Sequence, residues 1–219
     1  MTKLARIISI LFHPLFILFY LLLILLLVNP YAFNLSDPVD KGFVFISIFM
    51  LSIGLPIISI IMMRFVGFID SLEMKERTER IGPLIATSVF YLWLFINLKR
   101  VAIIPPIFQS LVLGSVIALF IAFFINNFSK ISLHAIGVGG LLAGFIIIRK
   151  FWAYHYFKIE LLGKPYSVGI DFLLILIVLI CGLVCFSRLY LKAHKKQDVY
   201  GGFILGFLTQ IIALRFIEL

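Results

Sequence analysis

Residues 187–202 read SRLYLKAHKKQDVYGG, a polar and basic stretch between two almost purely apolar runs. His194 and Asp198 are four residues apart in this stretch, so on a helix their side chains share a face and can touch. An imidazole oriented by a carboxylate can act as a nucleophile or as a general base. Arg188 adds a planar set of donors that suits two oxygens of a phosphate group. The stretch therefore indicates chemistry on a phosphate, unless it is only a solvated basic loop with an incidental histidine.

The composition places the chain in a membrane. Of its 219 residues, 63% are hydrophobic and only 13% are charged, and the mean hydropathy is +1.19. A soluble domain of this size does not need so much apolar surface, so we take the bilayer to be the solvent. The net charge of +9 lies mostly in short loops, which favours anionic lipid head groups as partners and argues against nucleic acid. The sequence contains no convincing cluster of metal ligands, so we expect no metal and no other cofactor.

Apolar runs of about 20 residues predict the membrane spans. The N-terminal run lacks a small-residue cleavage site, so it is interpreted as a first span rather than as a signal peptide. We expect an all-α, multi-pass transmembrane bundle of about six to seven spans, with residues 1–219 forming a single integral-membrane domain. The predicted spans are 7–28, 43–68 with a kink at Pro56, 83–98, 107–125, 135–148, 168–186 and 199–217.

The number of spans decides which loops can meet. The charged stretch 70–80 follows the second predicted span, the loop at Ser132 follows the fourth, and the basic stretch 187–202 follows the sixth. Two crossings separate each pair, so all three stretches emerge on one side of the membrane. The mixed aromatic and basic connection 149–165 then lies on the other side, as an interfacial helix or an aromatic belt.

The loop that contains Ser132 also carries a second histidine, His134. Both histidine-bearing loops lead into helices with glycines four residues apart, and such pairs let two helices approach closely in lipid. If these two helices pack together, His134 comes near His194; the alternative is packing of each helix elsewhere in the bundle. The glycines concerned are Gly140, Gly144, Gly202 and Gly206.

The charged stretch 70–80 reads DSLEMKERTER and supplies further cations. On a helix Arg77 and Arg80 share a face, whereas Lys75 points elsewhere. The same spacing also allows helical ion pairs with the glutamates of the stretch, which would make it a purely solvated segment. We take Arg77 and Arg80 as ligands of a phosphate group, with Lys75 as a third available cation.

The spacing of residues 187–198 resembles a signature of the type 2 phosphatidic acid phosphatase family, the lipid phosphate phosphatases. Ser187-Arg188, His194 and Asp198 match the third signature of that family, S-R-x5-H-x3-D, in full. The resemblance implies a membrane-integral phosphatase that works through a phosphohistidine intermediate without a metal. It makes His194 the nucleophile, Asp198 the residue that holds its ring in the right tautomer, and Arg188 a ligand of the phosphate.

The other two signatures of the family are matched in part. Ser132 and His134 match the Ser and His of the second signature, P-S-G-H, whereas Ile131 and Leu133 replace its Pro and Gly. The resemblance makes His134 the group that protonates the departing oxygen and later activates water, and it makes Ser132 a phosphate ligand. The stretch 70–80 departs from the first signature, K-x6-R-P, because no lysine stands seven residues before an arginine.

The expected activity is hydrolysis of a lipid phosphate or diphosphate, because the site lies where the head groups of the membrane lie. Polyprenyl diphosphate, phosphatidic acid, phosphatidylglycerol phosphate and a lipid A phosphate are the candidate substrates, and nothing in the sequence chooses among them. Two alternatives stay open: a phosphotransferase of the same fold, and a non-catalytic membrane protein such as a transporter or a lipid-binding scaffold. A bacterial inner membrane is the expected location, and the oligomeric state and the side that the site faces are left open.

Overall fold

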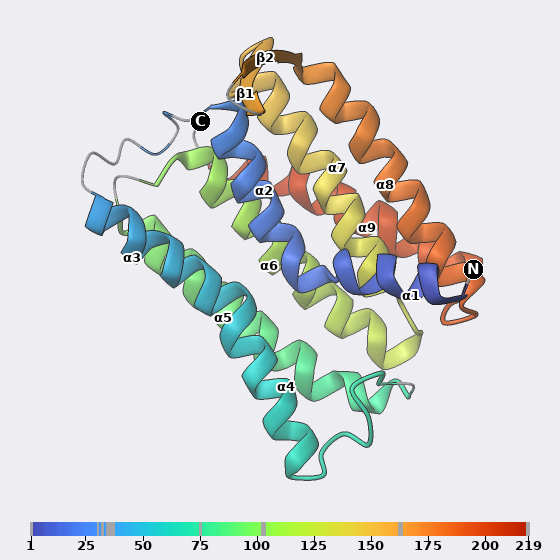
Figure 1. The fold of residues 1–219 in the computed structure, drawn as a ribbon. Coiled ribbons are helices and arrows are strands. Elements are labelled where there is room, and N and C mark those ends of the chain that lie inside the picture. The colour runs from blue at the N-terminus through green and yellow to red at the C-terminus, as the bar shows by residue number, and fades with distance from the viewer. Residues whose placement is uncertain are drawn as a thin grey trace.

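Long apolar helices make up most of the chain and pack side by side, with a small hairpin at one end (Figure 1). The computed structural model describes residues 2–29, 31, 33, 38–74, 76–101, 104–161 and 164–217. In this part of the chain, 6 helices are long and apolar enough to cross a bilayer, and a bent N-terminal pair makes up to 7. These findings confirm the predicted all-α transmembrane bundle and identify an integral membrane protein.

The helices follow the predicted spans closely, with the bounds shifted by a few residues, and the structure adds two strands that the prediction does not include. They are α1 (Thr2–Leu11), α2 (Pro14–Val28), α3 (Pro38–Phe49), α4 (Leu55–Phe65), α5 (Ile81–Lys99), α6 (Pro106–Phe128), α7 (Leu133–Phe151), β1 (Tyr156–Leu161), β2 (Lys164–Gly169), α8 (Ile170–Tyr190) and α9 (Lys196–Leu214).

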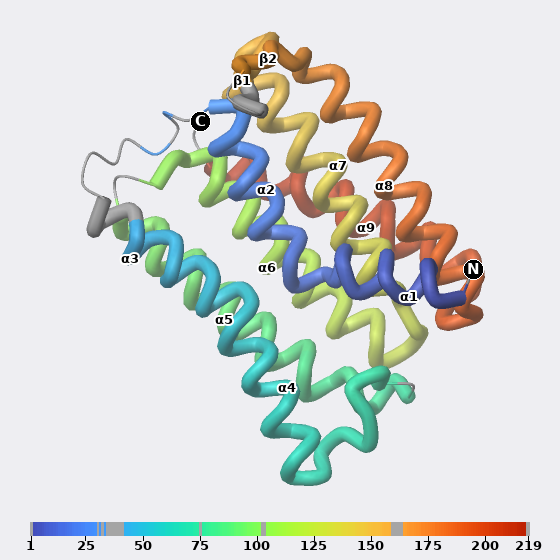
Figure 2. Tube along the Cα trace, in the orientation of Figure 1, coloured from blue at the N-terminus to red at the C-terminus, as the bar shows by residue number. Residues whose placement is uncertain are grey.

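The first predicted span, 7–28, is bent rather than continuous. α1 and α2 meet at an angle of 60°. Pro14 explains the break, because a proline has no N–H and holds the residue before it in the extended region, where His13 lies with φ −63° and ψ 139°. α1 consequently turns across the ends of the neighbouring helices and packs against α8 (Figures 1 and 2).

The second span contains a π-helical turn beside its proline. The turn, Met50–Gly54, joins α3 to α4 and directly precedes the first residues of α4, which include Pro56. A wider turn lets the helix continue where the proline offers no N–H, and the hydroxyl of Ser52 donates to the carbonyl of Ile48 at 2.6 Å. The structure therefore has a π-helical turn at the position of the predicted kink, and the helix continues beyond it to Phe65.

Glycines bring α7 and α9 into close contact. At Gly202, the place of a Cβ lies 2.7 Å from the carbonyl oxygen of Ser132, and side chains at Gly139 and Gly206 would likewise collide with carbonyl groups of the facing helix. Only a residue without a Cβ fits at these positions. The predicted pairing of the two histidine-bearing helices is therefore present, although Gly144 faces α2 and α6 instead of α9.

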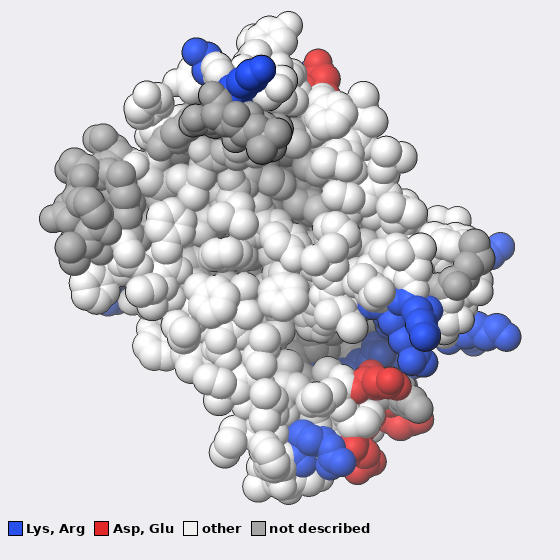
Figure 3. All heavy atoms as spheres, in the orientation of Figure 1, with Lys and Arg blue, Asp and Glu red and all other residues white. Residues whose placement is uncertain are grey.

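The core lies among α2, α5, α6 and α7, and the outward face of the same helices is also apolar. Figure 3 shows an uncharged band between two ends where charged side chains gather. This is the distribution expected of a protein whose middle faces lipid and whose ends face water. Core residues with 0% exposure include Leu22 and Leu25 of α2, Leu94 of α5, Phe108 and Leu111 of α6, and Phe145 of α7.

The connection 149–165 does not form the interfacial helix that was one of its two interpretations. α7 continues to Phe151, and β1 then pairs with β2 in an antiparallel hairpin from Tyr156↔Gly169 to Leu161↔Lys164. The residues of β1 alternate between polar and apolar, the period of two that a strand requires. Exposed Tyr154, Tyr156 and Tyr166 lie in or beside this hairpin, where an interfacial aromatic belt places its side chains.

Candidate functional site

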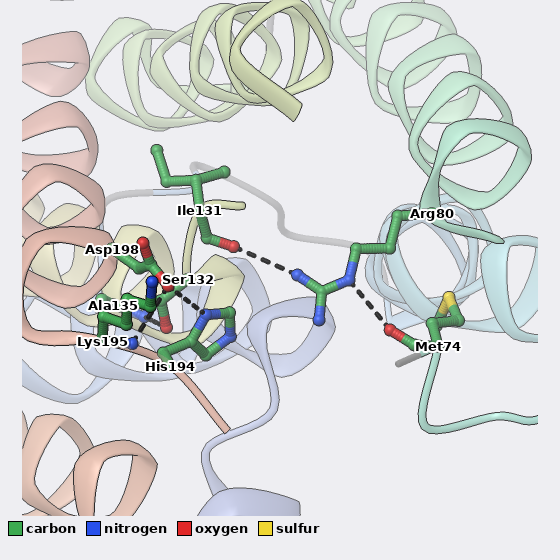
Figure 4. A network of polar contacts seen from close by, with 8 residues as sticks. All are labelled: Met74, Arg80, Ile131, Ser132, Ala135, His194, Lys195 and Asp198. Atoms are coloured by element: carbon green, nitrogen blue, oxygen red, sulfur yellow. Dashed lines mark hydrogen bonds and ion pairs between the residues drawn. The ribbon is translucent and has the colours of Figure 1, made fainter. Parts of the chain in front are cut away.

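The three polar stretches of the chain meet at one end of the bundle. The Nη1 of Arg80 donates to the carbonyl of Ile131 at 3.3 Å, and the backbone N–H of Ser132 donates to the carbonyl of Asp198 at 3.2 Å. The loop before α5, the loop before α7 and the start of α9 are thus hydrogen-bonded in series (Figure 4). An even number of crossings between the stretches predicts this convergence.

His194 and Asp198 are in contact, but not as neighbours on one helix. His194 lies in the turn before α9, and Asp198 is the third residue of the helix. The Nδ1 of His194 is 3.4 Å from the Oδ2 of Asp198, and the same oxygen accepts the backbone N–H of Lys195 at 3.1 Å. One carboxylate therefore caps the helix and orients the imidazole. Because Nδ1 faces a carboxylate, it carries the hydrogen, and the lone pair of the neutral ring lies on Nε2.

The surroundings of His194 keep its imidazole neutral. His194 is 9% exposed, and Figure 4 shows its ring between Asp198 and the guanidinium of Arg80. The pKa of His194 is lowered to about 4, mainly by burial and further by the charges of Arg80 and Arg188, against the opposing effect of Asp198. A neutral imidazole with a lone pair is the form that attacks as a nucleophile.

Two guanidinium groups line the cavity beside His194. Arg80 is 8% exposed and is held by hydrogen bonds from Nε to the carbonyl of Met74 and from Nη1 to that of Ile131. Arg188 lies in the last turn of α8, and its Nε is buried without a hydrogen-bond partner among the described residues. Buried positive charge is costly unless an anion compensates it, so the pair indicates a site for an anion such as phosphate.

A cavity of about 1050 Å³ extends from this site into the bundle. Its mouth carries charged residues, among them Arg6, Lys130 and Lys192 together with Glu73 and Glu76, and Figure 3 shows charged side chains bordering a hollow at this end. The rest of its lining comes mainly from apolar side chains of α2, α5 and α6, with the polar side chains of Thr87, Ser115 and Gln210 among them. A charged mouth above an apolar interior suits an amphiphilic molecule.

Two predicted phosphate ligands lie elsewhere, and a third is outside the described residues. Ser132 is fully buried, and its hydroxyl caps α7 by accepting the N–H of Ala135 at 3.4 Å. Arg77 is exposed and donates from Nη1 to the carbonyl of Asn127 at 3.2 Å. The cavity walls in the described part of the chain include neither Ser132 nor Arg77. Lys75 lies outside the described residues.

The stretch 70–80 is a loop, which corrects the expectation that Arg77 and Arg80 share a helix face. Among the described residues of this stretch, the 3₁₀ turn Thr78–Arg80 is the one helical part, and Met74 has a φ of 44°. The carboxylate of Glu79 accepts the backbone N–H groups of Asp70 at 2.8 Å and of Glu76 at 3.1 Å. A side chain that binds the backbone competes with helix formation in this way.

His13, which is not among the predicted site residues, lies beside His134 at the site. The Nε2 of His134 lies 2.9 Å from the carbonyl oxygen of Ser9, and its ring centroid lies 5.3 Å from that of His13. Both histidines line the cavity, and the charge of Arg188 acts on both imidazoles as well as on His194. The dipeptide His13-Pro14 inside an apolar run is the signal that could have indicated this polar corner.

Comparison of the chain with protein-family models, with curated proteins and with solved structures found no match. Among the described residues, no group of three or more histidines, cysteines, aspartates or glutamates is placed to hold a metal ion. The arrangement combines a buried neutral imidazole, a carboxylate that orients it, two cavity-lining guanidinium groups and a second imidazole. These groups together can bind a phosphate group, attack its phosphorus and move a proton.

Proposed function

We propose that the protein hydrolyses a lipid phosphate or diphosphate through a phosphohistidine intermediate, with His194 as the nucleophile. One observation carries the proposal. His194 is a buried imidazole oriented by Asp198, and Arg80 and Arg188 stand beside it at the mouth of a cavity with apolar walls. The full match of residues 187–198 to the third signature of the lipid phosphate phosphatases supports the same activity and, with it, a bacterial inner membrane as the location.

The reaction divides into two transfers of the phosphoryl group. In the first, the Nε2 of His194 forms a bond to phosphorus while the bond from phosphorus to the lipid oxygen breaks, and that oxygen takes the proton of the monoanionic phosphate group, which the neutral His134 accepts and passes on. Arg80 and Arg188 face the non-bridging oxygens, where negative charge is spread in the transition state. In the second, water attacks the phosphohistidine and gives a proton to His134, the bond from phosphorus to His194 breaks, and His134 passes the proton to the departing phosphate, so both imidazoles return to their neutral forms.

The cavity supports a lipid as the phosphate donor. Its apolar walls reach along α7 from His134 to Gly140, which is about 9 Å by the helix rise. A hydrophilic phosphate ester would gain nothing from such walls, whereas the first part of a lipid chain buries apolar surface there. The head group then lies among the cations of the mouth.

Phosphate release by the purified protein tests the activity. A panel of lipid monophosphates and diphosphates is supplied in the presence of EDTA, with His194→Ala and His134→Ala as variants and His155→Ala as the control. His155 is exposed near the hairpin, at the other end of the bundle, so its loss should leave the rate unchanged. We expect release that persists in EDTA and disappears in the first two variants.

The same assay distinguishes the alternatives. Phosphate that appears on a second lipid instead of in solution identifies a phosphotransferase. No transfer of phosphate from any lipid by the folded wild-type protein contradicts the proposal and leaves the non-catalytic membrane protein.

A further inference from the structure

The bend between α1 and α2 brings the backbone of residues 9–14, which we call the elbow, against His134. We propose that the elbow is a positioning device: the carbonyl of Ser9 and the ring of His13 hold His134 as its Nε2–H tautomer, so that His134 exchanges protons through Nδ1. The catalytic meaning of this arrangement rests on the proposed function, whereas the tautomer itself does not.

The hydrogen bond between His134 and Ser9 determines which ring nitrogen carries the hydrogen. The Nε2 of His134 lies 2.9 Å from the carbonyl oxygen of Ser9. A carbonyl oxygen can only accept a hydrogen bond, so Nε2 must be the donor. The lone pair of the neutral His134 ring therefore lies on Nδ1, and Nδ1 is the atom that takes up and gives back a proton.

The two imidazoles of the proposed reaction are consequently held in opposite tautomers. In His194 the Nδ1 faces the carboxylate of Asp198 at 3.4 Å, which leaves the lone pair on Nε2. In His134 the Nε2 faces Ser9, which leaves the lone pair on Nδ1. Each ring thus has one nitrogen bound to a fixed acceptor and one nitrogen for chemistry, as a nucleophile in His194 and as a proton carrier in His134.

The broken helix makes the Ser9 carbonyl available for this role. In a continuous helix this oxygen would accept the N–H of His13, four residues on, but the break at Pro14 ends the pattern. His134 then supplies the missing donor. The neighbouring carbonyl groups accept hydrogen bonds from within the elbow and α2: Ile8 from the N–H of Phe12 at 3.0 Å, Ile10 from the N–H of His13 at 3.2 Å, and Leu11 from the hydroxyl of Tyr20 at 2.7 Å.

His13 limits the rotation of the His134 ring. The two rings meet edge to face, at an interplanar angle of 84°. His13 is itself anchored, because its Nδ1 accepts the backbone N–H of Leu15 at 3.4 Å as the cap of α2. An anchored ring packed against His134 restricts the imidazole to the orientation that reaches Ser9. We therefore assign His13 as a positioning residue.

Ring-nitrogen NMR of isotopically labelled histidine tests the tautomer without any need for activity. The protein is placed in lipid nanodiscs, and each of its 4 histidines is assigned by its own substitution. We expect His134 as Nε2–H and His194 as Nδ1–H. A wild-type His134 that carries its hydrogen on Nδ1 overturns the inference, whether or not the protein releases phosphate.

A continuous helix in place of the elbow should remove the preference of His134 for the Nε2–H tautomer. Pro14→Ala restores an N–H and lets α1 and α2 join, so the Ser9 carbonyl is taken up within the helix and His134 becomes a mixture of tautomers. Pro56→Ala is the matched control, since Pro56 likewise lies near the start of an apolar helix but is not among the cavity-lining residues described. If His134 keeps the same tautomer in the Pro14→Ala protein, then some feature other than the elbow determines that tautomer, and the inference is overturned.

The kinetic test separates positioning from proton transfer by His13 itself. We expect His13→Ala to lower kcat roughly 10- to 100-fold with little change in KM, because a misplaced His134 affects the chemical step. His13→Phe keeps a ring packed on His134 and should recover most of the lost rate. A His13→Phe protein as slow as His13→Ala, or a change confined to KM, contradicts the positioning role.

Discussion

Both ends of the bundle carry positive charge, yet in the part of the chain that the structure describes only one of them buries it. At the hairpin end, Arg149 forms an ion pair with Asp171, and their side chains remain 44% and 69% exposed. At the site end, Arg80 is 8% exposed, and the Nε of Arg188 has no hydrogen-bond partner in the described part of the chain. An exposed ion pair contributes little free energy, whereas a buried guanidinium is costly until an anion binds. Burial of charge, rather than its amount, therefore distinguishes the end at which we propose that the phosphate binds.

Removing one arginine from each end should give the largest contrast. We expect Arg188→Gln to lower kcat/KM for a lipid phosphate roughly 100- to 1,000-fold, the effect of losing one donor to the transferring group. Arg149→Gln should change kcat/KM by less than about twofold, since an exposed pair contributes little. Steady-state phosphate release measures both. Equal losses in the two variants would show that general surface charge, and not the buried pair, attracts the substrate.

Replacing the carboxylate that orients His194 sharpens the comparison within the site. Asp198→Asn keeps a side-chain oxygen to cap α9 but no longer favours the hydrogen on Nδ1 of His194. We expect kcat to fall roughly 100-fold while the melting temperature changes little. Asp171→Asn is the control, because Asp171 interacts with a cation in solvent. A fully active Asp198→Asn protein would show that the pair serves only to cap the helix.

Neighbouring glycines of α9 provide a test of the packing that supports the site. A methyl group at Gly202 would lie 2.7 Å from the Ser132 carbonyl, whereas one at Gly201 meets nothing within 4 Å. Gly202→Ala should reduce the free energy of unfolding by about 1–3 kcal/mol through overpacking. Gly201→Ala should leave it equal or slightly higher, because alanine favours a helix. Thermal unfolding in detergent measures the difference, and a Gly202→Ala protein as stable as the Gly201→Ala protein would contradict the close contact of α7 and α9.

The pH profile is the smallest and most specific test. Because the pKa of His194 is lowered to about 4, the imidazole stays neutral as the pH falls from 7 to 5, and kcat/KM should decline only near pH 4. Arg188→Gln removes one of the charges that lower this pKa, so its decline should begin at a higher pH. A wild-type decline centred near pH 6.5, the ordinary value for histidine, would indicate a solvated His194.

The transmembrane spans were predictable because each is a long apolar run. Two crossings lie between each pair of polar stretches, and this even number predicted that all three emerge on one side of the membrane. The bend at Pro14 was not predictable from hydropathy, because hydropathy is averaged over a run of residues and does not register one missing N–H. The stretch 70–80 has charges at helical spacing, which left a helix open, whereas in the structure Glu79 binds the backbone N–H groups of Asp70 and Glu76.

The candidate site was predictable where a local spacing, a pair of packing glycines or the number of crossings carried the information, and its other tertiary contacts were not. His194 and Asp198 touch across a single turn, so their spacing carried the information. His134 and Ser9 are 125 residues apart, and no local pattern connects them. The family signature predicts Ser132 as a phosphate ligand, and the structure adds that its hydroxyl caps the start of α7. Tertiary contacts of this kind depend on the packing of distant helices.

The most direct test of the account is the identity of the residue that carries phosphate during turnover. The protein is mixed with a lipid phosphate, quenched within one turnover in alkali, and digested for mass spectrometry. We predict phosphate on His194, stable in alkali and lost in acid, and absent in His194→Ala. Turnover without any phosphorylated residue, or phosphate on a different residue, would contradict the central claim that His194 is the nucleophile.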